Sequence, residues 1–182
     1  MVAQTRTSRD TWIDTGLQAL ATGGPDAVRV DLLAKTLAVT RGGFYHHFAG
    51  RQAFLDALLD AWEHRSTDDV LDRVETEGGD ARAKVRKAGI LTFSKEVLPI
   101  DLAVRDWARR DRAVAKRLRR VDNRRMDYLR ALIGTFVDDP DDVEACAMLA
   151  FSLAIGSHFI AADHDGLSRP QVLERATMRL LA

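Results

Sequence analysis

The segment at residues 33–51, LAKTLAVTRGGFYHHFAGR, places the strongest constraint on what this chain can fold into. Leu33 and Leu37 lie four residues apart, which predicts a short helix that packs through one side. Residues 38–40 then form a tight turn, and Thr40 is placed to cap the next helix by accepting from a free backbone N–H. Two short helices joined by such a turn are typical of a helix-turn-helix.

The second helix is predicted at residues 41–47. Phe44 and Phe48, again four apart, would form its buried side. The residues that face outward are then Arg41, Gly42, Gly43, Tyr45 and His46 or His47. The major groove of DNA accepts one α-helix, whose N-terminal residues then contact base edges. Gly42 and Gly43 allow the backbone to approach the bases, although each weakens the helix by roughly 1 kcal/mol relative to alanine. A purely structural helix gains nothing from that weakness.

The N-terminal third of the chain resembles the TetR family of transcriptional regulators. The residues that carry the resemblance are Arg9, Trp12, Ile13, Leu17, Leu20, Leu33, Ala34, Val39, Thr40, Gly42, Phe44, Tyr45, His47, Phe48 and Arg51. It implies phosphate contacts for Tyr45 and His47, and further phosphate contacts for Thr40 and Arg51 at helix starts. It also implies that residues 41–43 read bases. The predicted DNA-binding residues are Thr40, Arg41, Gly42, Gly43, Tyr45, His46, His47 and Arg51.

Three positions depart from the family pattern. Ala38 stands where the turn usually has glycine, and a left-handed alanine is strained by roughly 1–2 kcal/mol. Arg51 replaces the usual lysine, which keeps the charge but changes the hydrogen-bonding geometry. Gly16 stands where the first helix usually has alanine. The pattern survives all three departures.

The remaining sequence predicts helices with short breaks, and no period-two strand pattern appears. Six helices are expected at about residues 7–21, 41–47, 82–97, 100–109, 111–136 and 141–162. Two more are expected to begin near residues 30 and 51, and a last one ends at residue 181. We therefore expect an all-α protein of about nine helices: an N-terminal three-helix DNA-binding domain with a helix-turn-helix and a C-terminal helical bundle. The predicted functional division is a helix-turn-helix DNA-binding domain at residues 1–50 and a ligand-binding and dimerisation domain at residues 51–182.

The chain has 182 residues, 46% of them hydrophobic and 30% charged, which is ordinary for a soluble globular protein. Its formal net charge is zero, but the charge is unevenly distributed. Residues 1–52 carry six basic side chains, Arg6 among them, against four acidic ones, whereas residues 131–182 carry three against eight. A dimer polarised in this way would present a weakly basic end to DNA. Few phosphate contacts predict a moderate salt dependence of binding.

The helix expected at residues 143–162 is rich in alanine and glycine, which lets helix backbones approach closely. The predicted dimer-interface residues are Leu149, Leu153, Gly156 and Phe159. The resemblance implies that the last two helices form the dimer, and two reading helices must lie one duplex turn, about 34 Å, apart. The alternative is an ordinary core helix within one subunit.

The resemblance also implies a cavity among the middle helices for a small-molecule effector. The candidate lining residues are Trp62, Phe93, Trp107, Met126, Tyr128, Phe151 and His158. Each of them alone also fits a core position. Together they favour an apolar or aromatic effector. Residues 105–130 are rich in arginine and lysine, which fits a solvated helix with i, i+4 ion pairs, or else a surface that binds nucleic acid or faces an anionic effector such as an acyl-coenzyme A.

The sequence gives little support to catalysis or metal binding. It contains no nucleophile elbow, phosphate loop or HExxH motif. His158 with residues 163–165 could ligate a metal, but a hydrated loop is the preferred interpretation, and we expect no metal and no cofactor. The single Cys146 excludes an internal disulfide and reads as a small buried residue. No signal peptide and no long apolar run are evident, so we expect a cytoplasmic protein without a membrane partner.

The sequence therefore predicts a homodimeric repressor, not an enzyme, that binds double-stranded DNA at a palindromic operator and releases it when a small molecule binds. One alternative is a helical ligand carrier or enzyme-like protein without specific DNA binding. Another is an activator, or a protein that binds DNA without sequence preference.

Overall fold

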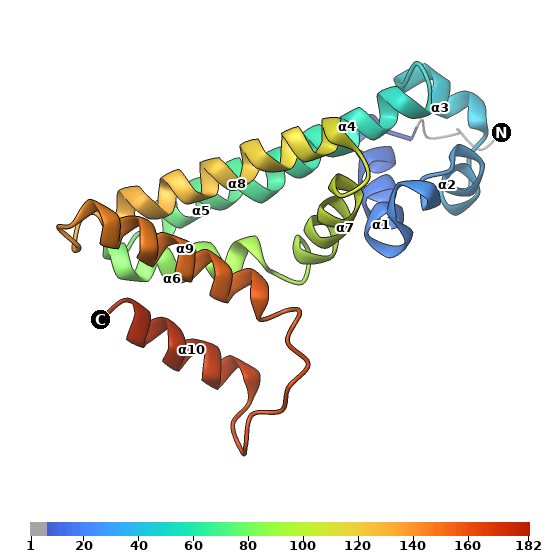
Figure 1. The fold of residues 1–182 in the computed structure, drawn as a ribbon. Helices are drawn as coiled ribbons and strands as arrows, with labels where there is room; N and C mark the ends of the chain where they lie inside the picture. Colours follow the sequence, from blue (N-terminus) through green and yellow to red (C-terminus); the bar gives the residue numbers. More distant parts are fainter. Residues whose placement is uncertain (1–6) are drawn as a thin grey trace. The chain divides into compact units, whose positions relative to one another are not determined.

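The computed structural model describes residues 7–182, and all the regular structure in that range is helical (Figure 1). The helices are α1 (Arg9–Ala27), α2 (Val30–Thr36), α3 (Arg41–His47), α4 (Arg51–Glu63), the π-helical turn η1 (His64–Asp68), α5 (Asp69–Glu77), α6 (Ala81–Thr92), α7 (Leu98–Ala108), α8 (Arg112–Ile133), α9 (Pro140–Gly156) and α10 (Arg169–Leu180). The expectation of an all-α fold is confirmed.

The described part of the chain divides into two compact units. The first combines the residues up to Ser66 with Lys95–Arg119, and the second combines Thr67–Ser94 with Arg120–Ala182. Each unit thus draws on two separated stretches of sequence. The division predicted at residue 50 separates a DNA-binding function from ligand binding and dimerisation. It does not describe compact units, and it stays a prediction.

The first unit is built around α1, which packs against α4 and α7. Its core is aromatic, since Trp12, Phe44 and Phe54 are fully buried. The ring of Phe44 meets those of Trp12 and Phe54 edge-on, with centroids 5.5 Å and 5.2 Å apart. Edge-to-face pairs contribute about 0.5–1.5 kcal/mol beyond the area they bury. These contacts fix α3 on α1 and α4.

Gly16 determines how closely α1 and α4 pack. A Cβ atom at Gly16 would lie 2.5 Å from Cζ of Phe54 and 2.8 Å from Cδ2 of Leu58. Because both side chains are fully buried, neither can move aside cheaply. The departure from alanine at this position is therefore a packing requirement.

A buried polar group joins α4 to α7. Nε1 of Trp62 donates to one carboxylate oxygen of Asp101 over 3.3 Å, and Nε of Arg105 donates to the other over 2.7 Å. Asp101 is fully buried. A carboxylate out of water needs such partners, because its desolvation is otherwise costly.

The second unit has its own apolar core. Its buried members are Val85, Met126, Leu129, Ile133, Ala147 and Leu181, and Cys146 is half-buried against them. A smaller cluster forms around Val74 where α5 meets α6. Beside it, Lys84 and the hydroxyl of Tyr128 donate to Glu75 and lower the pKa of that carboxyl group.

Among residues 7–182 there are ten α-helices, one more than expected, because the run that begins at Arg51 is interrupted. The five-residue π-helical turn η1 separates α4 from α5. Ser66 and Thr67 in this turn are buried, with at most 2% of their surface exposed. A π-helical turn inserts one residue into the helical repeat and so rotates the apolar face, which a fixed 3.6-residue period does not anticipate.

Two expected helix ends are wrong. The helix predicted at 82–97 ends at Thr92, because Pro99 lies in the first turn of α7 instead of closing the helix before it. Proline is tolerated there, since the first-turn N–H groups have no helical partner. The helix predicted to reach residue 162 ends at Gly156. The expected break at residues 23–25 occurs inside α1, where Gly23 and Gly24 are non-helical before one further turn.

Candidate nucleic-acid interface

The turn between α2 and α3 has the conformation that the helix-turn-helix pattern predicts. Ala38 adopts a left-handed backbone with φ of 54°, and the N–H of Val39 donates to the carbonyl of Ala34 over 2.9 Å. Thr40 occupies the N-cap position of α3, but its side chain makes no capping hydrogen bond. The expected side-chain cap is therefore wrong, and the exposed Thr40 hydroxyl is left for other partners.

Phe44 anchors α3 and decides which of its residues face solvent. Its ring is fully buried, and Phe48, just after the helix, is 5% exposed, so the predicted buried side is confirmed. Arg41, Gly42 and His46 are exposed, and 61% of Tyr45 is exposed. An exposed aromatic beside an arginine and a pair of glycines is a suitable surface for a major groove.

Nothing inside the protein requires glycine at positions 42 and 43. A Cβ atom at Gly42 would have only the Thr40 hydroxyl near it, at 3.7 Å, and one at Gly43 would touch Trp12 at 3.9 Å. Both are ordinary contact distances. Alanine would fit at either position and strengthen the helix, so the packing of the fold does not account for the two glycines.

Two predicted phosphate-binding side chains also hold the protein's own backbone. Nε2 of His47 lies 2.9 Å from the carbonyl of Thr7, and because a carbonyl only accepts, that nitrogen carries the proton. Arg51 donates from Nε to the carbonyl of Val28 over 2.9 Å, and from Nη2 to the carbonyl of Pro25. Both side chains are thereby held in place, one at the last residue of α3 and the other at the first residue of α4.

Some of the basic side chains of residues 1–52 make contacts within the protein. The guanidinium of Arg9 lies 5.2 Å from the ring centroid of Phe48, and Arg29 pairs with Asp31 over 3.1 Å. Arg41 and Lys35 are exposed. Arg6, which contributed to the predicted positive charge, lies outside the described residues.

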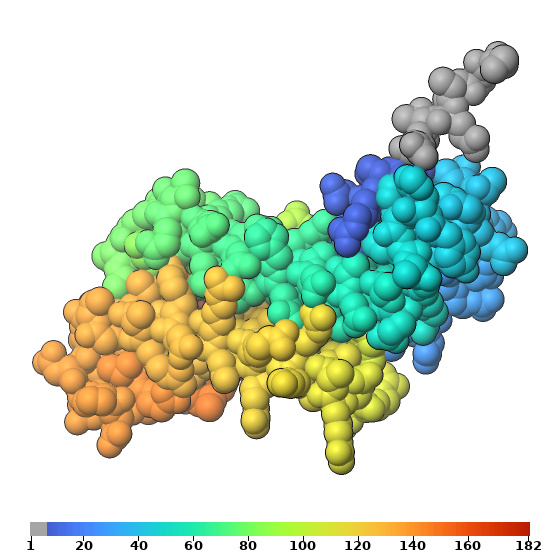
Figure 2. Space-filling model, turned by 90° about the horizontal axis from the view of Figure 1, so that it is seen from above, coloured from blue at the N-terminus to red at the C-terminus, as the bar shows by residue number. Residues whose placement is uncertain are grey.

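The basic side chains of residues 105–130 that lie in the first unit fall into two groups. Arg105 and Arg110 make i, i+4 pairs on α7 and the turn after it, while Arg117 pairs with Glu63 on α4 over 3.2 Å. Arg112, Lys116 and Arg119 are exposed and make no ion pair within residues 7–182. They lie on one side of α8, and long side chains project from its yellow segment in Figure 2.

The structure brings together three of the seven predicted effector residues. Phe93, Tyr128 and Phe151 line one small cavity of about 40 Å³ in the second unit. His158 lies beside it, with its ring 5.9 Å from that of Phe93. Burial and the neighbouring Arg169 guanidinium lower the pKa of His158.

The other three candidates lie elsewhere. Trp62 and Trp107 are buried in the first unit, and Met126 belongs to the core of the second. The sequence also missed Arg125, which lines the same cavity although only 5% of it is exposed. Its guanidinium lies 5.9 Å from the ring centroid of Phe93. In a segment so rich in arginine, the sequence offered no signal to separate this buried one from its solvated neighbours.

The predicted dimer residues fall into two pairs. Leu149 on α9 and Phe159 just after it are 56% and 67% exposed. Leu153 and Gly156 are half-buried. Further large apolar side chains are exposed on α9, α10 and the segment between them, namely Met148, Ile160, Leu167 and Met178. Isolated exposed apolar residues need no explanation, but a group of this kind marks a candidate interaction surface.

These features define a helical protein with a helix-turn-helix head. Residues 13–58 match the family of bacterial regulatory proteins known as the tetR family. The match spans the helix-turn-helix head, and over these residues the resemblance to TetR-family transcriptional regulators is confirmed. As a class, such regulators bind DNA and respond to ligands. No curated protein is significantly similar in sequence to the chain.

Solved structures share the fold over nearly the whole chain. A TetR-family transcriptional regulator from Streptomyces coelicolor, SCO4454, is 18% identical with a TM-score of 0.76, over 95% of this chain and 93% of that one. AibR, solved with isovaleryl coenzyme A and operator DNA, is 14% identical with a TM-score of 0.70, over 94% and 97%. A protein described as the superantigen PfiT is also 14% identical, with a TM-score of 0.69 over 92% and 93%. Similarity at this level shows the fold alone.

None of the helices in residues 7–182 combines the length and the apolar character that a membrane span requires.

Proposed function

We propose that the chain is a homodimeric transcriptional repressor that binds a palindromic operator through α3 and releases it when a small molecule binds. The observation that carries the proposal is the outer surface of α3. It exposes Arg41, Gly42 and Tyr45 on a helix that Phe44 anchors rigidly in an aromatic core. Operator binding would take place in the cytoplasm, where the DNA is.

The proposed reading mode follows from where the side chains lie. The N-terminal end of α3 would enter the major groove, with Arg41 on a base edge and the two glycines against the bases. Thr40 and Tyr45 would donate to phosphates on either side from their hydroxyl groups. His47 would donate from Nε2 in place of its hydrogen bond to the carbonyl of Thr7. Phosphate contacts set the register on the duplex, while the base contacts supply the specificity.

Dimerisation is proposed through α9, α10 and the segment between them. The exposed Leu149 and Phe159, with the apolar side chains around them, support this assignment. Burying such a surface against a second copy would remove apolar area from water. This burial would stabilise the dimer by about 25 cal/mol for each Å² of apolar surface.

The effector is proposed to bind at the cavity that Phe93, Tyr128 and Phe151 line. A cavity of about 40 Å³ holds little more than one water, whereas ligand sites usually measure about 300–1,000 Å³. An effector must therefore separate the helices that enclose the cavity. This displacement of helices is how effector binding would change the rest of the molecule. An apolar or aromatic body suits the lining. Arg125, which pairs with Asp122 over 3.5 Å, is the one charged residue among the residues that line the cavity.

Fluorescence anisotropy tests the proposal with the intergenic DNA beside the gene for this chain, at about 150 mM salt and with random duplex as competitor. We expect at least about a thousandfold preference for the operator, as specific binders show. A preference below about tenfold would instead favour a protein that binds DNA without sequence specificity.

The double substitution Arg41→Ala with Tyr45→Ala separates the regulator from a helical carrier or enzyme. We expect operator binding to be lost while the circular dichroism spectrum and the oligomeric state stay unchanged, because both side chains are exposed. The matched control is Arg86→Ala with Ile90→Ala, two exposed positions on α6. Operator binding that survives the first pair would contradict the proposed reading role of α3.

A further inference from the structure

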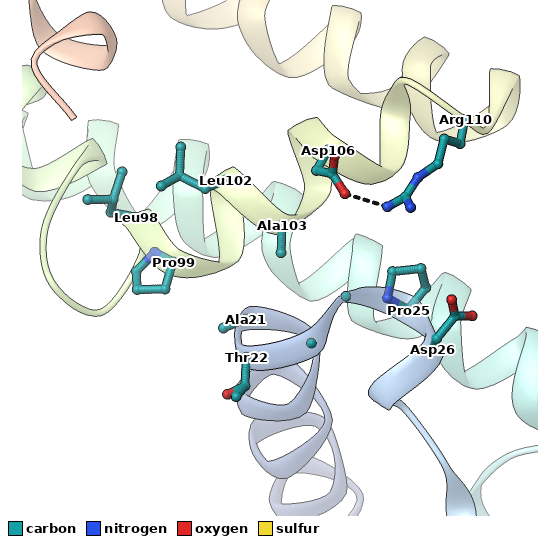
Figure 3. A pocket seen from close by; sticks show the side chains of 12 residues that line it. Ala21, Thr22, Pro25, Asp26, Leu98, Pro99, Leu102, Ala103, Asp106 and Arg110 are labelled. Carbon is teal, nitrogen blue, oxygen red and sulfur yellow. Dashed lines mark hydrogen bonds and ion pairs between the residues drawn. The ribbon is translucent and has the colours of Figure 1, made fainter. Parts of the chain in front are cut away.

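An open groove of about 610 Å³ lies in the first unit between residues 21–26 of α1 and the helix α7 with its following turn (Figure 3). This volume falls within the range of about 300–1,000 Å³ that small-molecule sites occupy. No residue predicted to bind the effector lines it. The groove exists because Gly23 and Gly24 are non-helical, so that α1 bends away before its last turn.

The two sides of the groove differ in chemistry. Leu98, Leu102 and Ala103 of α7 give it an apolar wall. The facing end of α1 offers hydrogen-bond acceptors. Pro25 has no N–H, so it cannot make the usual i→i−4 hydrogen bond to the carbonyl of Ala21. The carbonyl end of a helix also carries partial negative charge.

The charged groups at the rim leave the groove net acidic. Arg110 is the one cationic residue that lines it, and this side chain is already paired with Asp106, as the dashed line in Figure 3 marks. Asp26 is exposed and has no ion pair in the part of the chain that the structure describes. Asp26 is therefore left without a cationic partner among the residues that line the groove.

We propose that this groove binds a small organic cation, a primary ammonium attached to a short apolar or aromatic body. The ammonium group pairs with Asp26 at the carbonyl end of α1, and the apolar body lies on Leu102 and Ala103. This site is separate from the effector cavity of the second unit, whose one charged lining residue is the cationic Arg125.

The groove wall is hydrogen-bonded to the start of α4. The carbonyl of Pro25 accepts from the N–H of Val28 over 3.2 Å and from the guanidinium of Arg51. Arg51 is the first residue of α4 and follows α3 by a short turn. A ligand that displaces residues 23–26 therefore changes how Arg51 is held, and this lowers DNA affinity. That consequence rests on the proposed function, whereas the binding of the cation does not.

Benzylamine is the probe for the first test, titrated into the ¹⁵N-labelled full chain without DNA. We expect saturable shifts of the amide signals of Gly23, Gly24 and Ala103. Benzyl alcohol and benzoate should bind at least about threefold more weakly, the factor that one exposed ion pair supplies. Equal binding of benzyl alcohol, or shifts confined to other residues, would overturn the site.

Substitutions at the groove test which side chains bind benzylamine. Asp26→Asn should weaken benzylamine binding about threefold, whereas Asp10→Asn, which also removes an exposed carboxylate from α1, should leave it unchanged. Ala103→Phe fills the groove and should abolish binding, and circular dichroism reports whether that variant folds. An unchanged affinity in Asp26→Asn would overturn the assigned chemistry.

Anisotropy with operator DNA then tests the link to Arg51. We expect saturating benzylamine to lower the DNA affinity of the native chain and to leave that of Ala103→Phe unchanged. Bound benzylamine without an effect on DNA would overturn the link while the site stands. Absence of operator binding altogether would count against the proposed function and not against the groove, because the titration uses no DNA.

Discussion

At the scale of single residues, Ala38 is the position where the residue type does not suit the backbone conformation. Its φ of 54° is a conformation that favours glycine. Replacing Ala38 with glycine should raise the free energy of unfolding by about 0.5–1 kcal/mol, since the relief of strain exceeds the entropy that glycine adds to the unfolded chain. Urea denaturation measures the change. Ala53→Gly, at an exposed position of α4, is the control and should lower stability by about 1 kcal/mol.

A substitution at Gly42 should have opposite effects on the stability of the protein and on its affinity for DNA. Gly42→Ala should stabilise the protein by up to about 1 kcal/mol, because the added methyl group meets no atom closer than 3.7 Å. The same methyl group should lower operator affinity about tenfold or more, equivalent to about 1.4 kcal/mol, since it would stand between the helix and the bases. Urea denaturation and anisotropy give the two values. An unchanged operator affinity would show that α3 does not approach the bases at this point.

At the scale of helices, the contact between α4 and α7 depends on one buried carboxylate. Asp101→Ala removes the partner of both Trp62 and Arg105, and we expect the free energy of unfolding to fall by about 3 kcal/mol. Asp101→Asn keeps an oxygen acceptor and should be less harmful. Urea denaturation of both variants makes the comparison. A loss below about 1 kcal/mol in Asp101→Ala would mean that the two helices are held by apolar packing alone.

At the scale of the whole molecule, the dimer should depend on the apolar surface of α9 and the segment after it. Leu149→Glu with Phe159→Glu should convert the dimer to a monomer, because the interface would bury two unpaired carboxylates. Light scattering after size-exclusion chromatography measures the mass. The matched control is Ile90→Glu, a 71% exposed position on α6, which should leave the dimer intact. A double variant that remains dimeric would place the interface elsewhere.

The salt dependence of operator binding also belongs to the whole molecule. Each head presents few cations to DNA, chiefly Arg41 and Arg51, so a dimer should show a slope of about −2 to −4 in log affinity against log salt. Anisotropy between 50 and 300 mM salt, roughly the range in which counterion release is measured, gives the slope. A slope steeper than about −6 would show that further cations, such as Arg112, Lys116 and Arg119, reach the phosphates.

Most of the helix-turn-helix could be predicted because its signals are local, although the predicted side-chain cap at Thr40 was wrong. The bounds of α3 and the burial of Phe44 follow from spacings of a few residues. The left-handed turn at Ala38 was implied by the family resemblance. Family resemblance supplied the roles of Tyr45 and His47, and these roles remain predictions.

Elements that depend on distant contacts were predicted less well. The π-helical turn η1 and the early ends of α6 and α9 left no clear mark in the local pattern. Trp62 resembled a ligand-binding aromatic because sequence alone does not show Asp101 beside it. Arg125 was missed for the complementary reason, since most residues that line the cavity with it come from other helices, namely α5, α6 and α9.

The sequence by itself determined that the chain is all helical, that its head is a helix-turn-helix and that α3 exposes Arg41, Gly42 and Tyr45. These properties depend on backbone sterics and on apolar spacing within one or two helical turns. Only the tertiary structure decided which aromatics enclose a cavity, why Gly16 is required, and that a groove forms between α1 and α7. Those outcomes depend on atoms that are far apart in sequence, and their contacts are set by how whole helices pack.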